Sequence, residues 1–415
     1  MLVLVLALSA CSSTKKESRQ PILIEVNPGE SIQTAVDSAK SGDLVLINPG
    51  TYAGSIVIQT KDITLRGKER NSVIIDGKYE KDNGIIAAAD GIRIENLTVQ
   101  KFRTNGVLVQ GGYENQNQAT QSTKNTSSSE SILKRYSVQY VNALNNGLYG
   151  IYAFAAQEGV ISNTYTYGNA DAGIYIGQCK PCNAEVTYNY ATFNGLGIQG
   201  ANASGELYVY GNIFENNRSG IEFLSETKEL KSPQEKVVIA KNLVDKNNNQ
   251  DAPSSKPEIY GYGILIAGGA SNNIDGNSVT NNIVGGIVLT AQGDFLPNNN
   301  KVINNIVSNN AIDLQYFIVG RPDVMSLGNC FENNIFGSSN IEGIESKLLC
   351  KNASPGPFTA AFRAKPSTKN PPLYNEIAIP QIDEKNIEGN IREIPKNIVK
   401  ILHPDLNDLE TPKSR

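Results

Sequence analysis

A glycine followed by an aliphatic residue recurs along this chain at a nearly constant interval. The gaps between successive steps are 22, 44, 23, 24, 23, 43 and 23 residues, so most equal one period and two are nearly double. Residues after each glycine alternate in direction as in a β-strand, so this period predicts a solenoid of stacked coils. The glycines of these steps are Gly84, Gly106, Gly150, Gly173, Gly197, Gly220, Gly263 and Gly286.

Each repeat is expected to contain three short strands and three turns, with one face buried and the other in water. Asn tolerates a left-handed backbone best among non-glycine residues, and stacked Asn side chains can hydrogen-bond from coil to coil. An Asn precedes the glycine by 8 to 10 residues at Asn96, Asn163, Asn189, Asn212 and Asn277. The residue after the glycine should point inward, which predicts an aliphatic ladder of Ile151, Ile174, Ile198, Ile221, Ile264 and Ile287.

The first patterned segment predicts an amphipathic helix over residues 31–40, capped by the serine at its start. Ile32, Ala35, Val36 and Ala39 occupy positions i, i+3, i+4 and i+7, which place them on one helical face. The first coil of a solenoid has no neighbour to cover it, so we expect this helix to close that end.

The repeat and the opening stretch "EVNPGESIQTAVDSAKSGDLVLINPGTYAGSIVIQTKDITLRG" resemble the right-handed parallel β-helix family. This family includes pectate lyases, alginate epimerases and the periplasmic β-helix protein of nitrous-oxide reductase maturation. The resemblance covers roughly residues 22–350 and implies a single all-β domain with three strands per coil and short capping helices. A closer resemblance, to a bacterial subgroup, lies in "YGIYAFAAQEG", "DAGIYIGQCKPC" and "GNIFENNRSGI", and it implies no particular reaction.

Composition narrows the class of partner. The formal charge of -4, the pI near 5.4 and the scattered Lys and Arg residues provide no basic surface, so nucleic acid is not an expected partner. The 415 residues could hold two ordinary domains, but the repeat runs through most of them and indicates one elongated domain; we expect a monomer. Trp is absent and Tyr occurs 18 times, which suits sugar-binding surfaces and ordinary strand faces alike.

The first residues resemble a bacterial lipoprotein signal. A short apolar run ends in the sequence LSAC, which is similar to a lipobox cleaved before a lipid-modified Cys11. This implies a signal peptide over residues 1–10, a polar tether over 11–21 and an exported protein anchored in the cell envelope, at the outer membrane, its periplasmic side or the cell surface. The alternative is a signal peptide without lipid. No later run approaches the roughly 20 apolar residues of a membrane span.

Four further cysteines are expected to form two disulfides in an oxidising compartment, Cys179 with Cys182 and Cys330 with Cys350. One zinc site using all four is excluded, because the 148 residues from Cys182 to Cys330 correspond to about six coils, or roughly 30 Å. A redox role for the first pair is the alternative, but redox motifs of this spacing open a helix in a βαβ unit. Residues 330–350 should form a stapled C-terminal cap.

Two stretches interrupt the period and are expected to project as loops that flank a binding face. Residues 111–131 are rich in Gln, Asn, Ser and Thr, and residues 225–257 contain two charged, proline-bearing stretches, 225–236 and 247–257. The repeat pattern is lost after residue 350. Residues 351–415 contain nine prolines and predict an extended tail that docks in part along the solenoid.

Candidate binding chemistry lies on the outward face of the Gly-Ile strand, where relatives in the family bind polysaccharide. The second residue after each glycine forms an outward column of Tyr152, Tyr175, Gln199, Glu222, Leu265 and Val288. Tyrosines ~5 Å apart with polar groups beyond them could stack a sugar ring and hydrogen-bond its hydroxyls. The alternative is an ordinary solvated strand face. With residues from the same face and from neighbouring turns, the predicted ligand-binding set is Tyr152, Phe154, Tyr175, Gln178, Gln199, Arg218 and Glu222.

Fewer residues point to catalysis. Glycoside hydrolysis needs two carboxyl groups ~5 to 9.5 Å apart, for which Asp171 and Glu222 are the candidate pair. A calcium site like that of pectate lyases needs several clustered carboxylates, and the column is too sparse for one, so no cofactor is expected and calcium stays the alternative. His403, the only histidine, lies in the tail, which disfavours the Asp-Pro-His-Asp constellation of alginate epimerases and a Ser-His triad.

The sequence therefore predicts a lipoprotein of the cell envelope that binds polysaccharide or glycan along the outward face of the Gly-Ile strand. A glycan-modifying enzyme, such as a hydrolase, lyase or epimerase, is the second hypothesis. A structural or adhesive surface protein is the third. A carboxylate pair with raised pKa in a groove would indicate the enzyme, and a tyrosine surface without such a pair would indicate the binding protein.

Overall fold

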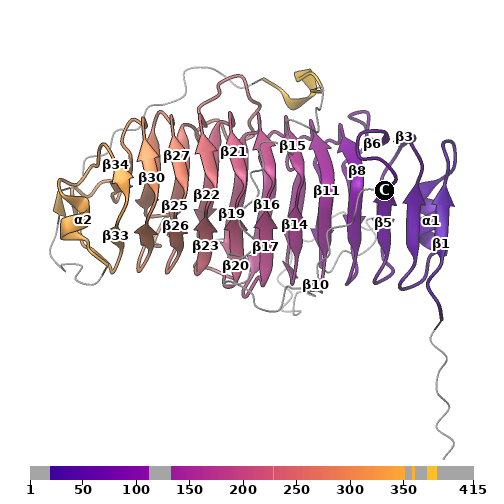
Figure 1. Ribbon diagram of the computed structural model, residues 1–415, viewed down its shortest axis with the longest axis horizontal. Coiled ribbons are helices and arrows are strands. Elements are labelled where there is room, and N and C mark those ends of the chain that lie inside the picture. The colour runs from indigo at the N-terminus through magenta and orange to yellow at the C-terminus, as the bar shows by residue number, and fades with distance from the viewer. Residues whose placement is uncertain (1–18, 112–131, 228, 351–357, 360–371, 381–415) are drawn as a thin grey trace, which may run out of the picture.

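The computed structural model describes residues 19–111, 132–227, 229–350, 358–359 and 372–380. Their strands stack into an elongated parallel β-helix with three rows of strands (Figure 1). The predictions for the signal peptide, for Cys11 and for nearly all of segment 111–131 lie outside the described residues. Within the described ranges, no helix is long and apolar enough to span a membrane.

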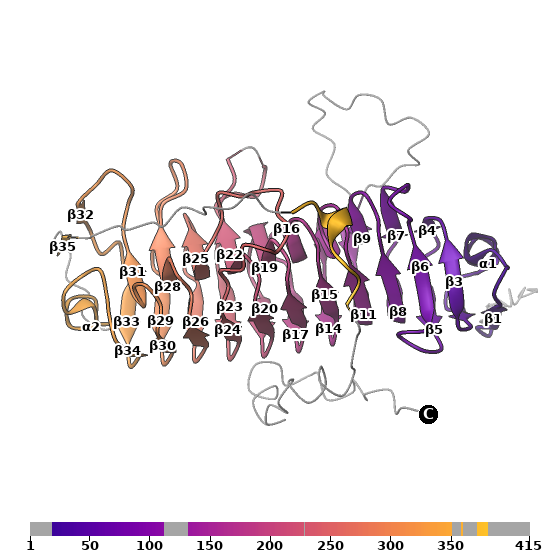
Figure 2. The same cartoon turned by 90° about the horizontal axis from the view of Figure 1, so that it is seen from above.

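The Gly-Ile strands form a ten-stranded parallel sheet, called here the Gly-Ile sheet. Its strands are β4 (Ile56–Ile58), β7 (Asn83–Ala87), β9 (Asn105–Gln110), β12 (Ile151–Phe154), β16 (Ala172–Cys179), β19 (Leu196–Ala203), β22 (Ser219–Leu224), β25 (Tyr262–Ala267), β28 (Gly285–Thr290) and β31 (Leu314–Tyr316). Figure 2 shows these strands side by side along the solenoid.

The other two rows join through the long strands β8 and β11 into a 21-stranded parallel sheet. Row one contains β1 (Leu23–Val26), β2 (Leu44–Ile47), β5 (Thr64–Gly67), β8 (Arg93–Gln100), β11 (Ser137–Leu144), β14 (Val160–Ser162), β17 (Ala184–Thr187), β20 (Leu207–Tyr210), β23 (Val237–Ala240), β26 (Asn273–Asp275), β29 (Lys301–Ile303) and β33 (Cys330–Glu332). Row two shares β8 and β11 and adds β3 (Gly50–Ala53), β6 (Val73–Asp76), β15 (Tyr165–Tyr167), β18 (Tyr190–Thr192), β21 (Ile213–Glu215), β24 (Leu243–Asp245), β27 (Ser278–Thr280), β30 (Ile306–Ser308) and β34 (Ile335–Phe336).

Two short pairings lie outside these rows. Strand β10 (Leu133–Lys134) pairs in parallel with β13 (Ala156–Gln157), and β32 (Asp323–Val324) pairs antiparallel with β35 (Phe358–Thr359). One 3-10 turn, η2 (Tyr374–Glu376), belongs to the tail. The prediction of three strands per coil is confirmed, since most coils contribute one strand to each row, and β8 and β11 each serve rows one and two as a single long strand.

The predicted aliphatic ladder is confirmed, because all six isoleucines are fully buried and pair in register from coil to coil. Glycine is required at the preceding position because the coils approach closely there. A Cβ atom added at Gly150 would lie 2.6 Å from the carbonyl oxygen of Gly173 in the next coil, and one at Gly220 would lie 2.5 Å from that of Gly263. A side chain at these positions would therefore separate the coils.

The asparagines form three ladders among the described residues, and the prediction was only partly right about their members. At each step an Asn accepts from the main-chain amide of the Asn one coil earlier, and at every step but that from Asn247 to Asn282 it also accepts from the side-chain amide. The first ladder holds Asn189, Asn212, Asn242, Asn277, Asn305 and Asn334, the second holds Asn146, Asn169, Asn194, Asn217, Asn247, Asn282 and Asn310, and the third holds Asn272, Asn300 and Asn329.

Asn96 and Asn163 lie outside all three ladders. Their φ angles are 55° and 54°, and the ladder position after Asn163 is occupied by Thr164, which bonds to Asn189. The left-handed residue and the ladder residue are therefore neighbours in the chain. The sequence prediction was wrong in assigning both roles to one residue, because the turn that needs φ > 0 comes immediately before the inward amide.

Both ends of the solenoid are capped as predicted. Helix α1 (Ile32–Ser38) is capped by Ser31, and its Gln33 exchanges hydrogen bonds of 3.0 and 2.8 Å with the main chain of Val57 on the edge strand β4. At the other end, helix α2 (Ile344–Lys347) lies in a segment closed by the Cys330–Cys350 disulfide. The Cys179–Cys182 disulfide is also present, so both predicted pairings are confirmed.

Residues 225–257 contain two loops, as the stretches 225–236 and 247–257 predicted. Strands β23 and β24 run through the segment and belong to an ordinary coil. They separate two loops, residues 225–236 and 246–261, called here loop one and loop two. Both loops return to the outer surface of the Gly-Ile sheet, because their polar groups bond to its strands and turns.

Candidate ligand-binding site

The predicted outward column is present in register on the Gly-Ile sheet. Tyr152 pairs with Tyr175, Tyr175 with Gln199, and Gln199 with Glu222. The column then becomes apolar with Leu265 and Val288. The polar and aromatic members therefore occupy four consecutive coils, as the Gly-Ile spacing predicted.

The column is not a solvated face, which corrects the prediction. Tyr175, Gln199 and Glu222 each expose no more than 5% of their surface, and only Tyr152 and Phe154 are half-buried. The outward face of a solenoid strand contacts solvent unless another part of the chain covers it. Loop one and loop two provide that cover.

Loop one borders the carboxyl end of β16 and β19. Gln178 donates its amide to the Glu229 carboxylate, and Asn202 exchanges two hydrogen bonds, of 2.9 and 3.0 Å, with the main chain of Glu226. Gln178 thus serves to hold loop one, and its side chain is 2% exposed.

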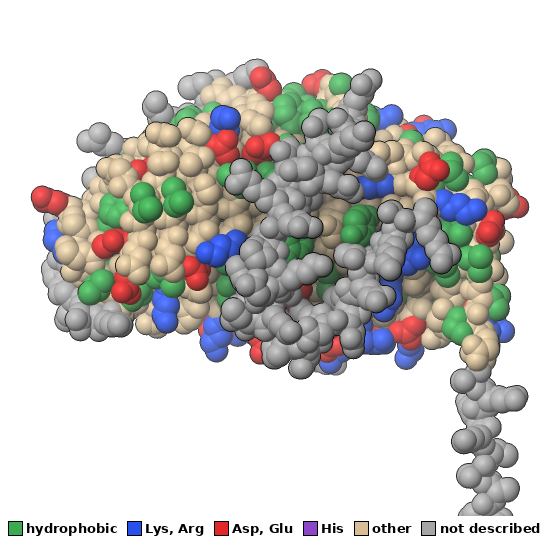
Figure 3. All heavy atoms as spheres, viewed as in Figure 1, with side chains coloured by type: hydrophobic (Ala, Val, Ile, Leu, Met, Phe, Trp, Pro, Cys, Tyr) green, Lys and Arg blue, Asp and Glu red, His purple; other side chains and the backbone are tan. Residues whose placement is uncertain are grey.

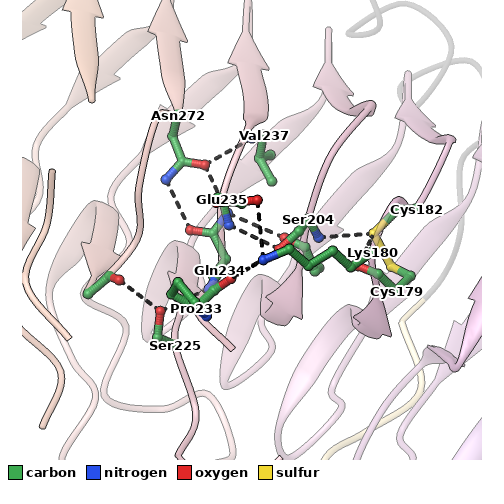
Figure 4. A network of polar contacts seen from close by, with 12 residues as sticks. Cys179, Lys180, Cys182, Ser204, Ser225, Pro233, Gln234, Glu235, Val237 and Asn272 are labelled. Carbon is green, nitrogen blue, oxygen red and sulfur yellow. Dashed lines mark hydrogen bonds and ion pairs between the residues drawn. A yellow bond between two sulfur atoms is a disulfide. The ribbon is translucent and has the colours of Figure 1, made fainter. Parts of the chain in front are cut away.

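A dense polar network anchors the base of loop one (Figure 4). Gln234 and Asn272 pair through both of their side-chain amides, at 2.8 and 3.0 Å, and Ser225 donates to the Gly268 carbonyl at 2.7 Å. On the neighbouring coil, Lys180 forms an ion pair of 3.2 Å with Glu235. The base of the loop is therefore fixed next to the Cys179–Cys182 turn.

Arg218 anchors loop two and does not project from the outer face, which corrects its predicted position. Its side chain is fully buried, and the guanidinium donates to the carbonyls of Gln250 at 3.3 Å and Pro257 at 3.5 Å. The same guanidinium lies over the Tyr260 ring, 5.1 Å from its centroid. Burial is the main cause of the lowered pKa of Arg218, and the charge of Tyr260 opposes it. Arg218 therefore shapes the site through loop two.

Loop two brings a lysine onto the column. Lys256 Nζ lies 3.1 Å from Asp171 Oδ2 and 3.1 Å from Gln199 Oε1, and Gln199 donates to Glu222 at 2.5 Å. Ser255 also donates to Asp171, at 3.0 Å. A continuous polar chain therefore runs Asp171, Lys256, Gln199, Glu222.

Asp171 and Glu222 do not contact each other in this arrangement, since Lys256 and Gln199 lie between them. Asp171 is engaged by two side chains of loop two, which is a structural role. Glu222 differs, because burial raises its pKa to about 7. The Gln199 hydrogen bond and the Lys256 charge partly oppose this rise, while Asp171 and Glu258 add to it. Near neutral pH, Glu222 can thus hold or release a proton.

The aromatic members form one stacked cluster. The ring centroids of Tyr152 and Tyr175 are 4.8 Å apart with 19° between the planes, and Tyr149 and Phe154 stack on Tyr152 at 4.9 and 5.6 Å. Rings this close and nearly parallel overlap face to face with an offset. Their faces are consequently shared with one another, and a ligand would meet ring edges and hydroxyls.

Gly177 makes room for this cluster. A Cβ atom at this position would lie 2.6 Å from Tyr175 Cε1, so the tyrosine ring extends along the strand above the glycine. Burial raises the pKa of the Tyr175 hydroxyl well above its usual range, and the charge of Glu229 adds to the rise. The cluster therefore presents neutral hydroxyls, which donate and accept hydrogen bonds.

Sequence reasoning missed Lys256 and Tyr149. Lys256 is 57 residues from Gln199 along the chain, and only the return of loop two brings them together. Tyr149 is the residue directly before Gly150, and its ring packs against Tyr175 in the cluster. The sequence could have identified it, because it lies next to a Gly-Ile step. No group of three or more His, Cys, Asp or Glu side chains that could hold a metal ion occurs among the residues the structure describes.

Comparison with known proteins shows the family to which this fold belongs. A family model described as "Right handed beta helix region" matches residues 71–231 and 127–348. The A-module of a mannuronan C-5 epimerase from Azotobacter vinelandii is similar over 74% of this chain and 91% of its own, at 15% identity and a TM-score of 0.51.

Two further solved structures are similar at lower scores. A second A. vinelandii epimerase A-module, at 14% identity, covers 74% of this chain and 93% of its own with a TM-score of 0.48. A DFA-IIIase from Arthrobacter chlorophenolicus A6, at 12% identity, covers 76% and 98% with a TM-score of 0.48. The family model spans well over half of the 415 residues. The chain belongs to the right-handed β-helix family.

Proposed function

We propose that this protein binds a polysaccharide or glycan at the outer face of the Gly-Ile sheet. The observation that carries the proposal is the junction of the tyrosine cluster with the polar chain of Lys256, Gln199 and Glu222. Sugars offer many hydroxyls for hydrogen bonding, and this junction supplies tyrosine hydroxyls, a lysine, an amide and a carboxyl group as their partners. The similar fold of a mannuronan epimerase module supports this ligand class.

The half-buried Tyr149, Tyr152 and Phe154 are the first contacts available to such a ligand. Gln199 and Glu222 lie beneath loop two and become reachable only when Lys256 moves. A ligand that carries carboxylates would compete with Asp171 for Lys256, because both are anions. We therefore expect acidic polysaccharides to bind better than neutral ones.

Affinity measurements on mannuronan, pectate and a neutral glucan test the proposal. Tyr152→Phe removes one hydroxyl and keeps the ring stack, so we expect affinity to fall about 3- to 10-fold, the value of one hydrogen bond. Tyr188→Phe, in the turn between β17 and β18, is the matched control and should bind as the parent does. If the parent binds none of the three polymers, the scaffold or adhesive role becomes the better reading.

A glycan-modifying enzyme is the second candidate function, and the buried Glu222 with its pKa of about 7 favours it. A carboxyl group that titrates near neutral pH suits general acid or base chemistry. Glu222→Gln distinguishes the two functions. A catalytic carboxyl would lose turnover with binding retained, whereas a binding carboxyl would lose affinity.

We further propose that the protein is exported and anchored through lipid on Cys11. The LSAC sequence supports this proposal. Cys11→Ala should release the protein from the membrane fraction, as measured by detergent partitioning of expressed protein. Unchanged partitioning of this variant would contradict lipid anchoring and leave the glycan proposal untouched.

A further inference from the structure

Row two carries an outward column of apolar residues along most of the solenoid. The first outward positions of its strands pair in register from coil to coil. We call this set the apolar column, and it contains Tyr165, Tyr190, Ile213, Leu243, Ser278, Ile306 and Ile335. A single serine interrupts it.

The apolar column becomes more exposed toward the C-terminal end of the solenoid. Ile213 is 6% exposed, Leu243 38%, Ile306 49% and Ile335 68%. The next outward position on the same strands is polar over most of its length, as a face in water should be; it contains Thr192, Glu215, Asp245, Thr280 and Ser308. Aliphatic side chains aligned on neighbouring coils beside a polar column indicate a surface that receives a partner.

The chain's own tail already covers the first part of this column. Tyr374 packs edge-on against Tyr79, with centroids 5.7 Å apart, and the Ile377 carbonyl accepts from the Asn145 side chain. Ile379 then packs on the cluster of Leu144 and Tyr165. Figures 1 and 2 show the tail turn η2 against the outside of the solenoid. From Tyr79 to Tyr165 the tail thus advances toward the C-terminal coils.

Residues 372–380 also show how the column is contacted. Ile377 and Ile379 are half-buried while Ala378 between them is exposed, so alternate side chains face the solenoid. The strands of row two pair with neighbours on both sides, and an added segment can therefore bind only through its side chains. Proline, which lacks a main-chain donor, is compatible with such docking.

We propose that the apolar column is a docking surface for the C-terminal segment of this chain, residues 381–415. Five coils separate Tyr190 from Ile335, about 24 Å at ~4.8 Å per coil, which roughly eight extended residues can span. The 35 residues after Pro380 are more than sufficient. They supply spaced aliphatic side chains, among them Ile382, Ile387, Ile391, Ile394 and Ile398.

Tethering favours this occupant over a separate partner. The segment begins where Ile379 already contacts the column, so its local concentration is on the order of millimolar. A second copy of the chain would have to be present in solution at that concentration to compete with the tethered segment for the column. The docked segment also continues an interface that the structure shows, in the same direction along the solenoid.

Cysteine labelling tests the proposal. Ile306→Cys is made in the full chain and in a chain that ends at Pro380, and each is treated with a charged maleimide. Peptide mass mapping reads the rate at each position, so Cys11 does not interfere. We expect Ile306→Cys to react at least 10-fold more slowly in the full chain than in the shortened one. Lys301→Cys, exposed on row one of the same coil, is the control and should react equally in both.

Each other outcome overturns the proposal. Equal, fast labelling of Ile306→Cys in both chains means that residues 381–415 leave the column open. Slow labelling in both chains means that something else covers it, and a dependence on protein concentration would identify a second copy. Glycan binding at the Gly-Ile sheet is unaffected by any of these results, since it uses a different row.

Discussion

The two faces of strands β16, β19 and β22 are both buried, but for different reasons. The inner face repeats one residue, with Ile174, Ile198 and Ile221 stacked in register and fully buried. The outer face changes at every coil, from Tyr175 to Gln199 to Glu222, and is almost as buried. Coil closure alone buries the inner face, whereas the outer face depends on two loops.

This difference shows at which positions of a solenoid the residue type can change from coil to coil. The inner positions meet the same neighbours in every coil, so one shape is repeated and no polar partner is needed. The outer positions meet loop residues, such as Lys256, that differ from coil to coil. Buried polar groups there must be hydrogen-bonded, which explains the continuous chain from Asp171 to Glu222.

The largest effect is expected from the inner face. Ile198→Ala should lower the free energy of unfolding by about 2 to 5 kcal/mol, because a fully buried side chain leaves a cavity. Gln199→Ala, the neighbouring outer residue, should cost about 1 to 3 kcal/mol through lost hydrogen bonds. Urea unfolding of both variants measures the comparison, and a cost for Gln199→Ala as large as for Ile198→Ala would contradict it.

The next effect is a pH dependence that originates on the outer face. Glu222 has its pKa raised by burial from 4.5 to about 7, so the folded state holds its proton more tightly than the unfolded state. Stability from this group is full below about pH 4.5 and is lost as the pH rises to about 7, by a total on the order of 3 kcal/mol.

Glu222→Gln should remove this dependence, as measured by urea unfolding at several pH values. Ile198→Ala is the control, since it lowers stability at every pH and leaves the slope unchanged. A slope between pH 4.5 and 7 that survives in Glu222→Gln would show that other groups produce it.

The smallest effect concerns loop two, which covers the outer face through Lys256. Lys256→Met removes the charge that lowers the pKa of Glu222, so that pKa should rise further. Because Lys256 is 34% exposed, the global cost should be about 1 kcal/mol or less. Amide hydrogen exchange should become faster in loop two and stay unchanged in the inner ladder. Lys256→Arg keeps the charge, so it should preserve both the pKa of Glu222 and the slow amide exchange of loop two. Equal exchange in the parent, Lys256→Met and Lys256→Arg would mean that Lys256 does not hold the loop.

The sequence predicted most residues on the outer face of the Gly-Ile sheet, and the predictions that were wrong share one cause. The order Tyr152, Tyr175, Gln199, Glu222 followed from the Gly-Ile spacing and is confirmed. Arg218 looked like a surface cation but holds loop two from within the protein. Sequence spacing predicts which residues share a coil, but it carries no information on where a long insertion returns.

The sequence by itself determined the coil period, the inward isoleucines, the capping helices and both disulfides, because these depend on contacts between neighbouring repeats or short chain separations. Only the tertiary structure decided that the outer face is covered, that Lys256 joins Asp171 to Gln199, and that the tail crosses row two at Tyr165. Such contacts join segments tens to hundreds of residues apart. Their geometry depends on how loops fold back, which no repeat encodes.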